Sequence, residues 1–269
     1  MIFLTIIVLL LGLSLGSFAN CLIWRLYKQE TIGGRSYCPL CKKTLAWYDN
    51  IPLLSFAFLK GRCRFCHKSI SWQYPAVELA VAALFLFFWF KHLGFVCWPL
   101  ENLIPFIEEP MFWLALVRDW LAIFVLTVVF VFDLRFYMVS TQLAVVAAAV
   151  FLIINICLGT TWYLPFISMG IGVAFFGAQF ILTKGKGIGE GDIWLGLMLG
   201  ALFPQLNLLI LAILAGYIFG TLIALVLLAI GRKAWTSQLP LGVFLAMGAI
   251  FALIWGNRLL DVYWQWSRL

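Results

Sequence analysis

The chain has 269 residues, of which 65% are hydrophobic and 11% charged, and its mean hydropathy is +1.06. This composition excludes a soluble globular protein, because too few polar side chains remain to cover its surface, and it indicates a polytopic membrane protein. The net charge of +7 is compatible with nucleic acid, but no basic-arm or stacked-aromatic motif accompanies it. We therefore expect membrane lipid, with its anionic headgroups, and no nucleic acid among the partners.

Apolar runs separated by charged clusters predict an all-α fold of about eight transmembrane helices. The first run has no basic segment before it, so a spanning helix is favoured over a cleaved signal peptide. The predicted spans cover residues 2–24, 74–90, 111–132, 139–158, 164–183, 192–204, 207–230 and 240–257.

The lysines and arginines predict how these helices are oriented. If the hydrophilic stretch at residues 25–75 is cytoplasmic, fourteen of the 18 Lys and Arg residues lie on the cytoplasmic side, as the positive-inside rule requires. Both termini then lie outside, and so does the loop that carries Glu101, Glu108 and Glu109.

Two cysteine pairs in this hydrophilic stretch predict a metal site. Cys38-Pro-Leu-Cys41 and Cys63-Arg-Phe-Cys66 have the spacing of a zinc ribbon, in which four thiolates close a tetrahedral structural site. Two disulfides are the alternative, which a reducing cytoplasm disfavours. His67 is interpreted as a surface residue because four cysteines already complete the site. The remaining cysteines are expected to be small packed hydrophobes; they are Cys21, Cys97 and Cys157.

Asp192 ends the stretch Gly187-Ile-Gly-Glu-Gly-Asp192 and begins an apolar run, so it lies where a loop enters a membrane helix. An ionisable residue at membrane depth indicates function and needs a partner. The predicted topology supplies Asp133, because one helix runs inward to Asp133 and another runs outward from Asp192. Two neighbouring carboxylates share a proton and titrate as a unit, as in aspartic proteases. The alternative is that both aspartates are merely interfacial, with Asp133 paired to Arg135.

Glu78, one turn into the second predicted helix, is expected either to pair with a basic residue or to face a polar ligand pocket. Arg118 and Asp119, near the outer end of the third helix, are interpreted as a structural ion pair. Glycines on helix surfaces predict close helix packing; they are Gly170, Gly172, Gly177, Gly216 and Gly220.

With these residues laid out, the chain resembles the bacterial type IV prepilin peptidases, which are leader peptidases and N-methyltransferases. The resemblance covers nearly the whole chain, and Gly189-Glu-Gly-Asp192 fits the Gly-x-Gly-Asp motif that this family shares with presenilin-like proteases. The other matching stretches are Leu15-Gly-Ser-Phe-Ala-Asn20, Ile23-Trp-Arg-Leu26, Trp47-Tyr-Asp-Asn-Ile-Pro-Leu-Leu-Ser55, Gly61-Arg-Cys-Arg64, Ile70-Ser-Trp-Gln-Tyr-Pro75, Val77-Glu-Leu79 and Leu239-Pro-Leu-Gly-Val-Phe-Leu-Ala-Met-Gly248.

The resemblance implies removal of a short basic leader from prepilins or pseudopilins at the cytoplasmic face of the bacterial inner membrane, followed by methylation of the new N-terminal amine with S-adenosylmethionine. Asp133 and Asp192 match the catalytic aspartates, and Glu78 is a candidate for the cofactor site. Two positions depart from the family pattern: Ser140 replaces a usual proline and Trp194 a frequent lysine. These departures bear on substrate fit near the aspartates rather than on the aspartates themselves.

The resulting division of the chain has four parts: a first transmembrane helix at 1–24, a cytoplasmic zinc-binding domain at 25–75, a second helix with an outside loop at 76–110, and a helical protease domain at 111–269. A presenilin-like protease of other membrane substrates, without methyltransferase activity, is the alternative enzyme. A channel or transporter is the alternative outside the enzymes, but the hydropathy shows no inverted repeat.

Overall fold

The computed structural model describes residues 2–93, 109–231 and 239–267. The predicted outside loop with Glu101 and Glu108, and also Cys97, lie outside these residues. The chain forms two compact units, residues 1–128 and residues 129–269, with the boundary inside one helix.

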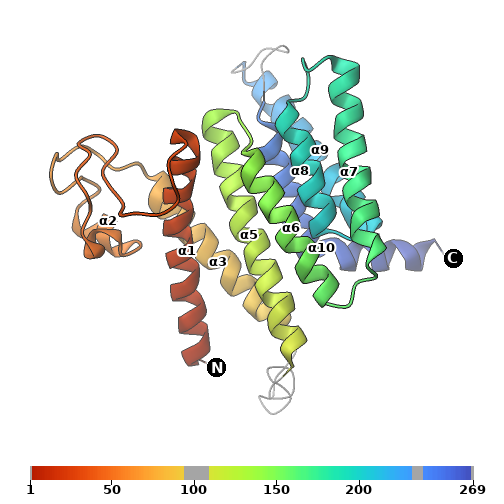
Figure 1. The fold of residues 1–269 in the computed structure, drawn as a ribbon, viewed down its shortest axis with the longest axis horizontal. Helices are drawn as coiled ribbons and strands as arrows, with labels where there is room; N and C mark the ends of the chain where they lie inside the picture. Colours follow the sequence, from red (N-terminus) through yellow and green to blue (C-terminus); the bar gives the residue numbers. More distant parts are fainter. Residues whose placement is uncertain (1, 94–108, 232–238, 268–269) are drawn as a thin grey trace. The chain divides into compact units, whose positions relative to one another are not determined.

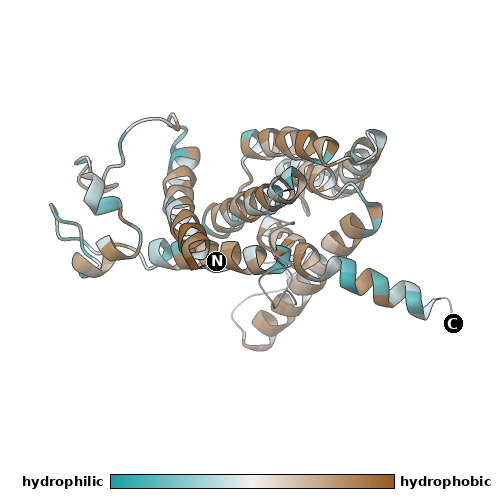
Figure 2. Ribbon diagram, turned by 90° about the horizontal axis from the view of Figure 1, so that it is seen from below, coloured by the Kyte–Doolittle hydropathy of each residue, from teal (hydrophilic) through white to brown (hydrophobic). Residues whose placement is uncertain are grey.

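All eight predicted apolar runs are helical, so the predicted fold class is confirmed (Figure 1). Within the described residues, six helices are long and apolar enough to cross a membrane, whereas α6 and α8 are shorter, with 17 and 13 residues. Brown, apolar segments make up most of these helices (Figure 2). The described residues contain no β-strand, only two isolated bridges. The helices are α1 (Ile2–Lys28), α3 (Gln73–His92), α5 (Pro110–Phe136), α6 (Thr141–Cys157), α7 (Tyr163–Thr183), α8 (Glu190–Leu202), α9 (Leu206–Ala229) and α10 (Leu241–Trp266), with the short α2 (Leu54–Phe58) between α1 and α3.

In the first unit, glycines let α1 lie directly against α3. A Cβ atom added at Gly16 would lie 2.6 Å from the Cα atom of Glu78, so any side chain there would separate the two helices. On its other side, α3 packs on α5 through the rings of Phe85 and Trp120, which stack with centroids 5.2 Å apart. The indole N–H of Trp120 also donates to the Phe85 carbonyl at 3.1 Å.

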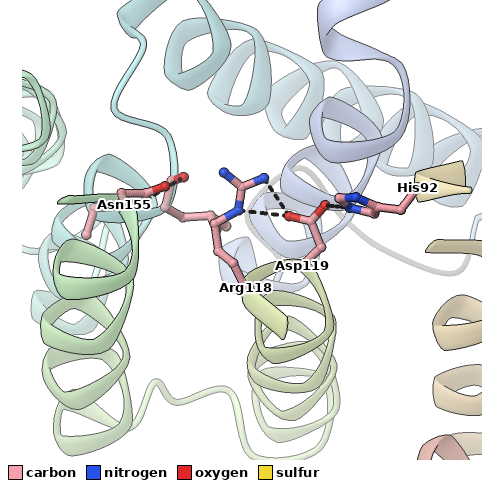
Figure 3. Close-up of polar contacts among 6 residues, drawn as sticks. His92, Arg118, Asp119 and Asn155 are labelled. Carbon is pink, nitrogen blue, oxygen red and sulfur yellow. Dashed lines mark hydrogen bonds and ion pairs between the residues drawn. The ribbon is translucent and has the colours of Figure 1, made fainter. Parts of the chain in front are cut away.

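The predicted ion pair of Arg118 and Asp119 is confirmed, and a third residue joins it (Figure 3). Asp119 is only 3% exposed, and its carboxylate lies 2.7 Å from Arg118 and 2.8 Å from Nε2 of His92 at the end of α3. A buried carboxylate needs such partners because desolvation of an unpaired charge is costly. His92 was missed in the sequence because no local pattern links it to Asp119.

In the second unit, α8 lies against α7 at backbone contact. A Cβ atom added at Gly196 would lie 2.5 Å from the Gly172 carbonyl oxygen, and one at Gly200 would lie 2.5 Å from Met169. Glycine therefore lets the two helices approach until their backbones touch. The prediction of close packing is confirmed for Gly172 and, against α10, for Gly216 and Gly220. The prediction is wrong for two others on α7, since nothing lies within 4 Å of a Cβ atom at Gly170 or Gly177.

The end of α8 is held by two buried side chains of neighbouring helices. The amide of Asn155 on α6 donates to the Ala201 carbonyl at 2.8 Å, and the hydroxyl of Ser168 on α7 donates to the Pro204 carbonyl at 2.7 Å. With 13 residues, α8 is about 20 Å long and shorter than a bilayer core of about 30 Å. Its last carbonyls would lack partners inside the membrane. Asn155 supplies a donor to one of them, and Ser168 supplies a donor to the Pro204 carbonyl just after the helix.

Candidate functional site

Asp133 lies one turn before the end of α5 and is 4% exposed. Its Oδ2 accepts a hydrogen bond from the backbone N–H of Val243 at 3.2 Å. A Cβ atom added at Gly242 would lie 2.8 Å from the same oxygen. The start of α10 therefore touches this carboxylate with its backbone, which only a glycine at this position permits.

Asp192 is the third residue of α8 and is 7% exposed. Its Oδ2 accepts a hydrogen bond from the N–H of Gly189 at 3.0 Å, which fixes the side chain at the helix N-terminus. A Cβ atom at Gly191 would lie 2.7 Å from Cβ of Val139, in the connection between α5 and α6. Gly191 is thus required for close approach, whereas Gly189 acts through its N–H and has ordinary space around it.

The second unit brings the ends of α5 and α8 that carry the two predicted aspartates side by side, since a Cβ atom at Gly242 would lie 2.8 Å from Oδ2 of Asp133 and 3.2 Å from Leu195, one turn after Asp192. The side chain of Arg135, the alternative partner, lies over the ring of Phe136 at 5.4 Å. Backbone N–H groups thus hold Oδ2 of both aspartates within a buried, apolar surrounding. A pair of this kind can hold one proton between two oxygens and act as base and acid toward one water molecule.

The four predicted metal ligands also come together, in the first unit. Their Sγ atoms all lie within 4.8 Å of one another, and those of Cys38 and Cys66 are 4.0 Å apart. A tetrahedral zinc ion with Zn–S bonds of about 2.3 Å needs sulfur atoms about 3.8 Å apart. The donor set therefore fits zinc, and the described cysteines are all unpaired thiols rather than disulfides.

The two cysteine pairs form the same turn twice. Lys42 and His67, which follow the second cysteine of each pair, both have positive φ, 60° and 55°. Their N–H groups donate to the carbonyls of Cys38 and Cys63 at 2.8 Å and 2.9 Å. The N–H of Cys66 lowers the pKa of the Cys63 thiol to about 7, which favours the thiolate that a metal requires. Isolated bridges close each turn, joining Tyr37 to Thr44 and Arg62 to Ser69. His67 is exposed, as predicted.

Two further residues hold this segment, and the sequence reading missed both. Asp49 is 8% exposed and pairs with Arg64 at 2.8 Å, and this hydrogen-bonded contact raises the pKa of the Arg64 guanidinium. Arg25, buried at the end of α1, donates to backbone carbonyls that include those of Gly33 and Gly34, at 2.7 Å and 2.9 Å. The contact of Arg25 with these carbonyls could have been predicted from a lone arginine near the end of a membrane helix that is followed by two glycines.

Glu78 is 6% exposed on α3, and its described partners are neutral rather than basic. Its Oε2 accepts from the backbone N–H of Leu53 at 2.8 Å, and the Ser17 hydroxyl also contacts the carboxylate. Leu53 has a φ of 59°, a conformation that a leucine rarely adopts. Glu78 thus holds a strained turn of the cysteine-rich segment against α1 and α3.

Two family models match the chain. The model described as the bacterial peptidase A24 N-terminal domain matches residues 10–92, and that of the type IV leader peptidase family matches residues 120–225. The first match contains the four clustered cysteines and Glu78. The second contains both aspartates.

Curated relatives extend the similarity over nearly the whole chain. A prepilin leader peptidase/N-methyltransferase of Bacillus subtilis is 30% identical over 264 residues, which cover 96% of both chains. One of Stutzerimonas stutzeri is 30% identical over 97% of this chain and 94% of its own length. One of Myxococcus xanthus is 34% identical over 82% of this chain and 63% of its own length. No solved structure matches. The site and fold define a helical membrane peptidase, and the chain belongs to the type IV leader peptidase family.

Proposed function

We propose that this protein removes the leader peptide of type IV prepilins or pseudopilins with Asp133 and Asp192 as its catalytic pair, and then methylates the new N-terminal residue. The observation that supports the peptidase is that two buried carboxylates, each held by a backbone N–H, lie at the neighbouring ends of α5 and α8. The family and the names of its relatives support the substrate class.

In the proposed reaction, the unprotonated aspartate takes a proton from water as the water oxygen attacks the scissile carbonyl carbon. The protonated aspartate gives its proton to the carbonyl oxygen, so a neutral tetrahedral intermediate forms. The C–N bond then breaks while one aspartate returns a proton to the departing amine and the other accepts the hydroxyl proton. The hydrogen bonds from Val243 and Gly189 keep both carboxylates oriented throughout, which avoids reorganisation.

The proposed location is the bacterial inner membrane, with the cysteine-rich segment and both aspartates at the cytoplasmic face. The six helices of sufficient length and apolarity in the described part of the chain support a multi-pass membrane protein. The lysine and arginine distribution supports the orientation. In this proposal the peptidase occupies residues 111–269 and residues 25–75 form a separate zinc-binding domain.

We assign a structural zinc ion to Cys38, Cys41, Cys63 and Cys66, because the donor set has tetrahedral size and offers no open position. Methyl transfer is assigned to the region from Gly16 to Glu78, with Glu78 as the candidate contact for S-adenosylmethionine. That cofactor supplies an electrophilic methyl group when bound, and a carboxylate suits its sulfonium charge. The contacts of Glu78 with Leu53 and Ser17 account for its burial without a ligand.

Purified protein in detergent, incubated with a prepilin-type precursor and S-adenosylmethionine, tests both activities by mass spectrometry of the product. We expect loss of the leader and gain of one methyl group. An Asp192→Asn protein should leave the precursor intact yet still methylate a pre-cleaved pilin that has a free N-terminus. Cleavage without any methylation by a folded, zinc-loaded wild-type protein would support the presenilin-like alternative and contradict the methyltransferase.

A further inference from the structure

Two polar side chains that the proposed reaction does not use lie near Asp192 in the second unit. The hydroxyl of Tyr217, on α9, donates to Oε1 of Gln179, on α7, at 2.9 Å. Helices α7 and α8 run antiparallel, with Met169 against Gly200 and Gly172 against Gly196, so Gln179 near the end of α7 lies level with the first turn of α8, which carries Asp192. Both side chains are only partly buried, so a further molecule can reach them.

Backbone packing fixes Tyr217 in this position. The neighbouring Gly216 lies against α10, where an added Cβ atom would be 3.0 Å from the Phe244 carbonyl oxygen. The Tyr217 ring then meets Phe175 of α7 edge to face, with centroids 6.1 Å apart. These contacts leave the phenol ring little rotational freedom, so its hydroxyl is held at a defined place.

The hydrogen bonds of this pair define which atoms remain for a ligand. Nε2 of Gln179 faces the Phe175 carbonyl, which can only accept, at 3.5 Å. Oε1 therefore faces the Tyr217 hydroxyl, whose oxygen keeps its lone pairs, while Nε2 keeps a second proton. The pair thus presents an acceptor and a donor side by side, which is the complement of one N–H and one C=O of a peptide main chain.

A peptide bond near a membrane needs such partners before it is cleaved. The substrate chain must leave the helical conformation for water to reach its carbonyl carbon, and its main-chain N–H and C=O groups then lose their internal hydrogen bonds. An unsatisfied main-chain group in an apolar surrounding costs several kcal/mol. A site that cleaves the chain there has to replace those hydrogen bonds.

We propose that Tyr217 and Gln179 are positioning residues that hydrogen-bond the extended main chain of the precursor beside Asp192, with the Tyr217 oxygen accepting a substrate N–H and Gln179 donating to a substrate carbonyl. This inference rests on the proposed peptidase function. Neither residue exchanges protons with the reacting atoms. Their contribution is to hold the strand so that the scissile carbonyl faces the aspartates.

The test compares cleavage kinetics of the wild type and Tyr217→Phe. A hydrogen bond made equally to substrate and transition state raises KM when it is lost and leaves kcat unchanged. We expect KM to rise about three- to tenfold, the range for one neutral hydrogen bond, with kcat unchanged. Tyr163→Phe, at the exposed start of α7, is the matched control and should behave as the wild type.

A purely structural bridge between α7 and α9 predicts another result. Tyr217→Phe would then lower the unfolding temperature and the active fraction, so kcat would fall while KM stayed at the wild-type value. That outcome would overturn the inference. Failure of the wild type to cleave the precursor at all would instead overturn the proposed function.

Main-chain recognition can be tested directly with precursor peptides in which single amide N–H groups are replaced by ester oxygens. At one position near the scissile bond, the ester should lower kcat/KM of the wild type about three- to tenfold. The same ester should cause no further loss in Tyr217→Phe, because its partner is already gone. If, at every ester position, kcat/KM falls by the same factor in Tyr217→Phe as in the wild type, Tyr217 does not contact the substrate main chain.

Discussion

Helix α8, which carries Asp192, and the segment between α1 and α3, which carries the four cysteines, differ in what holds them. Helix α8 has 13 residues, of which Asp192 and seven others are buried. Its glycines touch α7 at backbone distance. In residues 31–72 the buried residues are three, and they are Cys38, Asp49 and Cys63. The helix is held by packing, whereas the segment has almost no apolar core and relies on thiols, an ion pair and backbone hydrogen bonds.

Because of this difference, the two candidate sites should fail in different ways. A packed helix is sensitive to added volume, because its neighbours cannot move apart without opening gaps. A small segment without a core is sensitive to loss of its metal, as in other small domains that a metal holds together. Substitutions that damage one region should therefore spare the other.

Replacing either aspartate should have the greatest effect, because it removes the proton-transfer group while both regions stay folded. Asp133→Asn and Asp192→Asn should each reduce leader cleavage by about 10²–10⁴-fold, because an amide cannot exchange the shared proton. Glu190→Gln, two residues from Asp192 but exposed, is the control and should retain activity. Cleavage by either asparagine variant at the wild-type rate, measured on purified protein, would show that the pair is not catalytic.

Loss of one thiol should unfold the cysteine-rich segment alone. Cys63→Ser removes a ligand from a site whose binding free energy, about 10 kcal/mol or more in small zinc domains, is also folding free energy. We expect elemental analysis to find near-stoichiometric zinc in the wild type and little in the variant. Limited proteolysis should then cut within residues 31–72, and methylation should fall at least as much as cleavage. Cys157→Ser, at an exposed position outside the cluster, should keep the zinc.

Added volume should disturb α8 alone. In Gly196→Ala the new methyl group would lie 2.5 Å from the Gly172 carbonyl oxygen, so we expect about 1–3 kcal/mol of destabilisation from overpacking. Gly177→Ala adds the same methyl group to α7 where nothing lies within 4 Å, and should be close to neutral. Thermal unfolding in detergent measures both, and zinc content should stay unchanged. Equal effects of the two substitutions would contradict the close contact of α7 and α8.

The smallest expected effect concerns the hydrogen bonds at the end of α8. Ser168→Ala leaves the Pro204 carbonyl without its 2.7 Å donor, and hydrogen bonds between membrane helices contribute about 0.6 kcal/mol on average. We expect a small decrease in unfolding temperature with cleavage retained. Ser14→Ala is the matched control, since the Ser14 hydroxyl bonds only its own helix. A decrease as large as that of Gly196→Ala would mean that capping rather than packing holds α8.

The sequence predicted the helices well because each is a local apolar run whose length can be read from neighbouring residues. It also predicted that the four cysteines come together, since a short turn between two cysteines forces both thiols to one side. The prediction that Asp133 and Asp192 lie at one membrane face came from counting the membrane crossings between them. The packing roles of Gly170 and Gly177 were predicted wrongly because composition does not say which face of a helix meets a neighbour.

Local patterns in the sequence thus account for the helical membrane fold and for the clustering of the four cysteines, and the alternation of crossings predicted the pairing of the two aspartates. The groups that orient these side chains are set by tertiary packing. Val243 donates to Asp133 across 110 positions in the chain, Glu78 meets Leu53 across 25, and Tyr217 meets Gln179 across 38. Such partners are set by which helix faces pack together, and that choice depends on contacts summed over whole helices rather than on any motif.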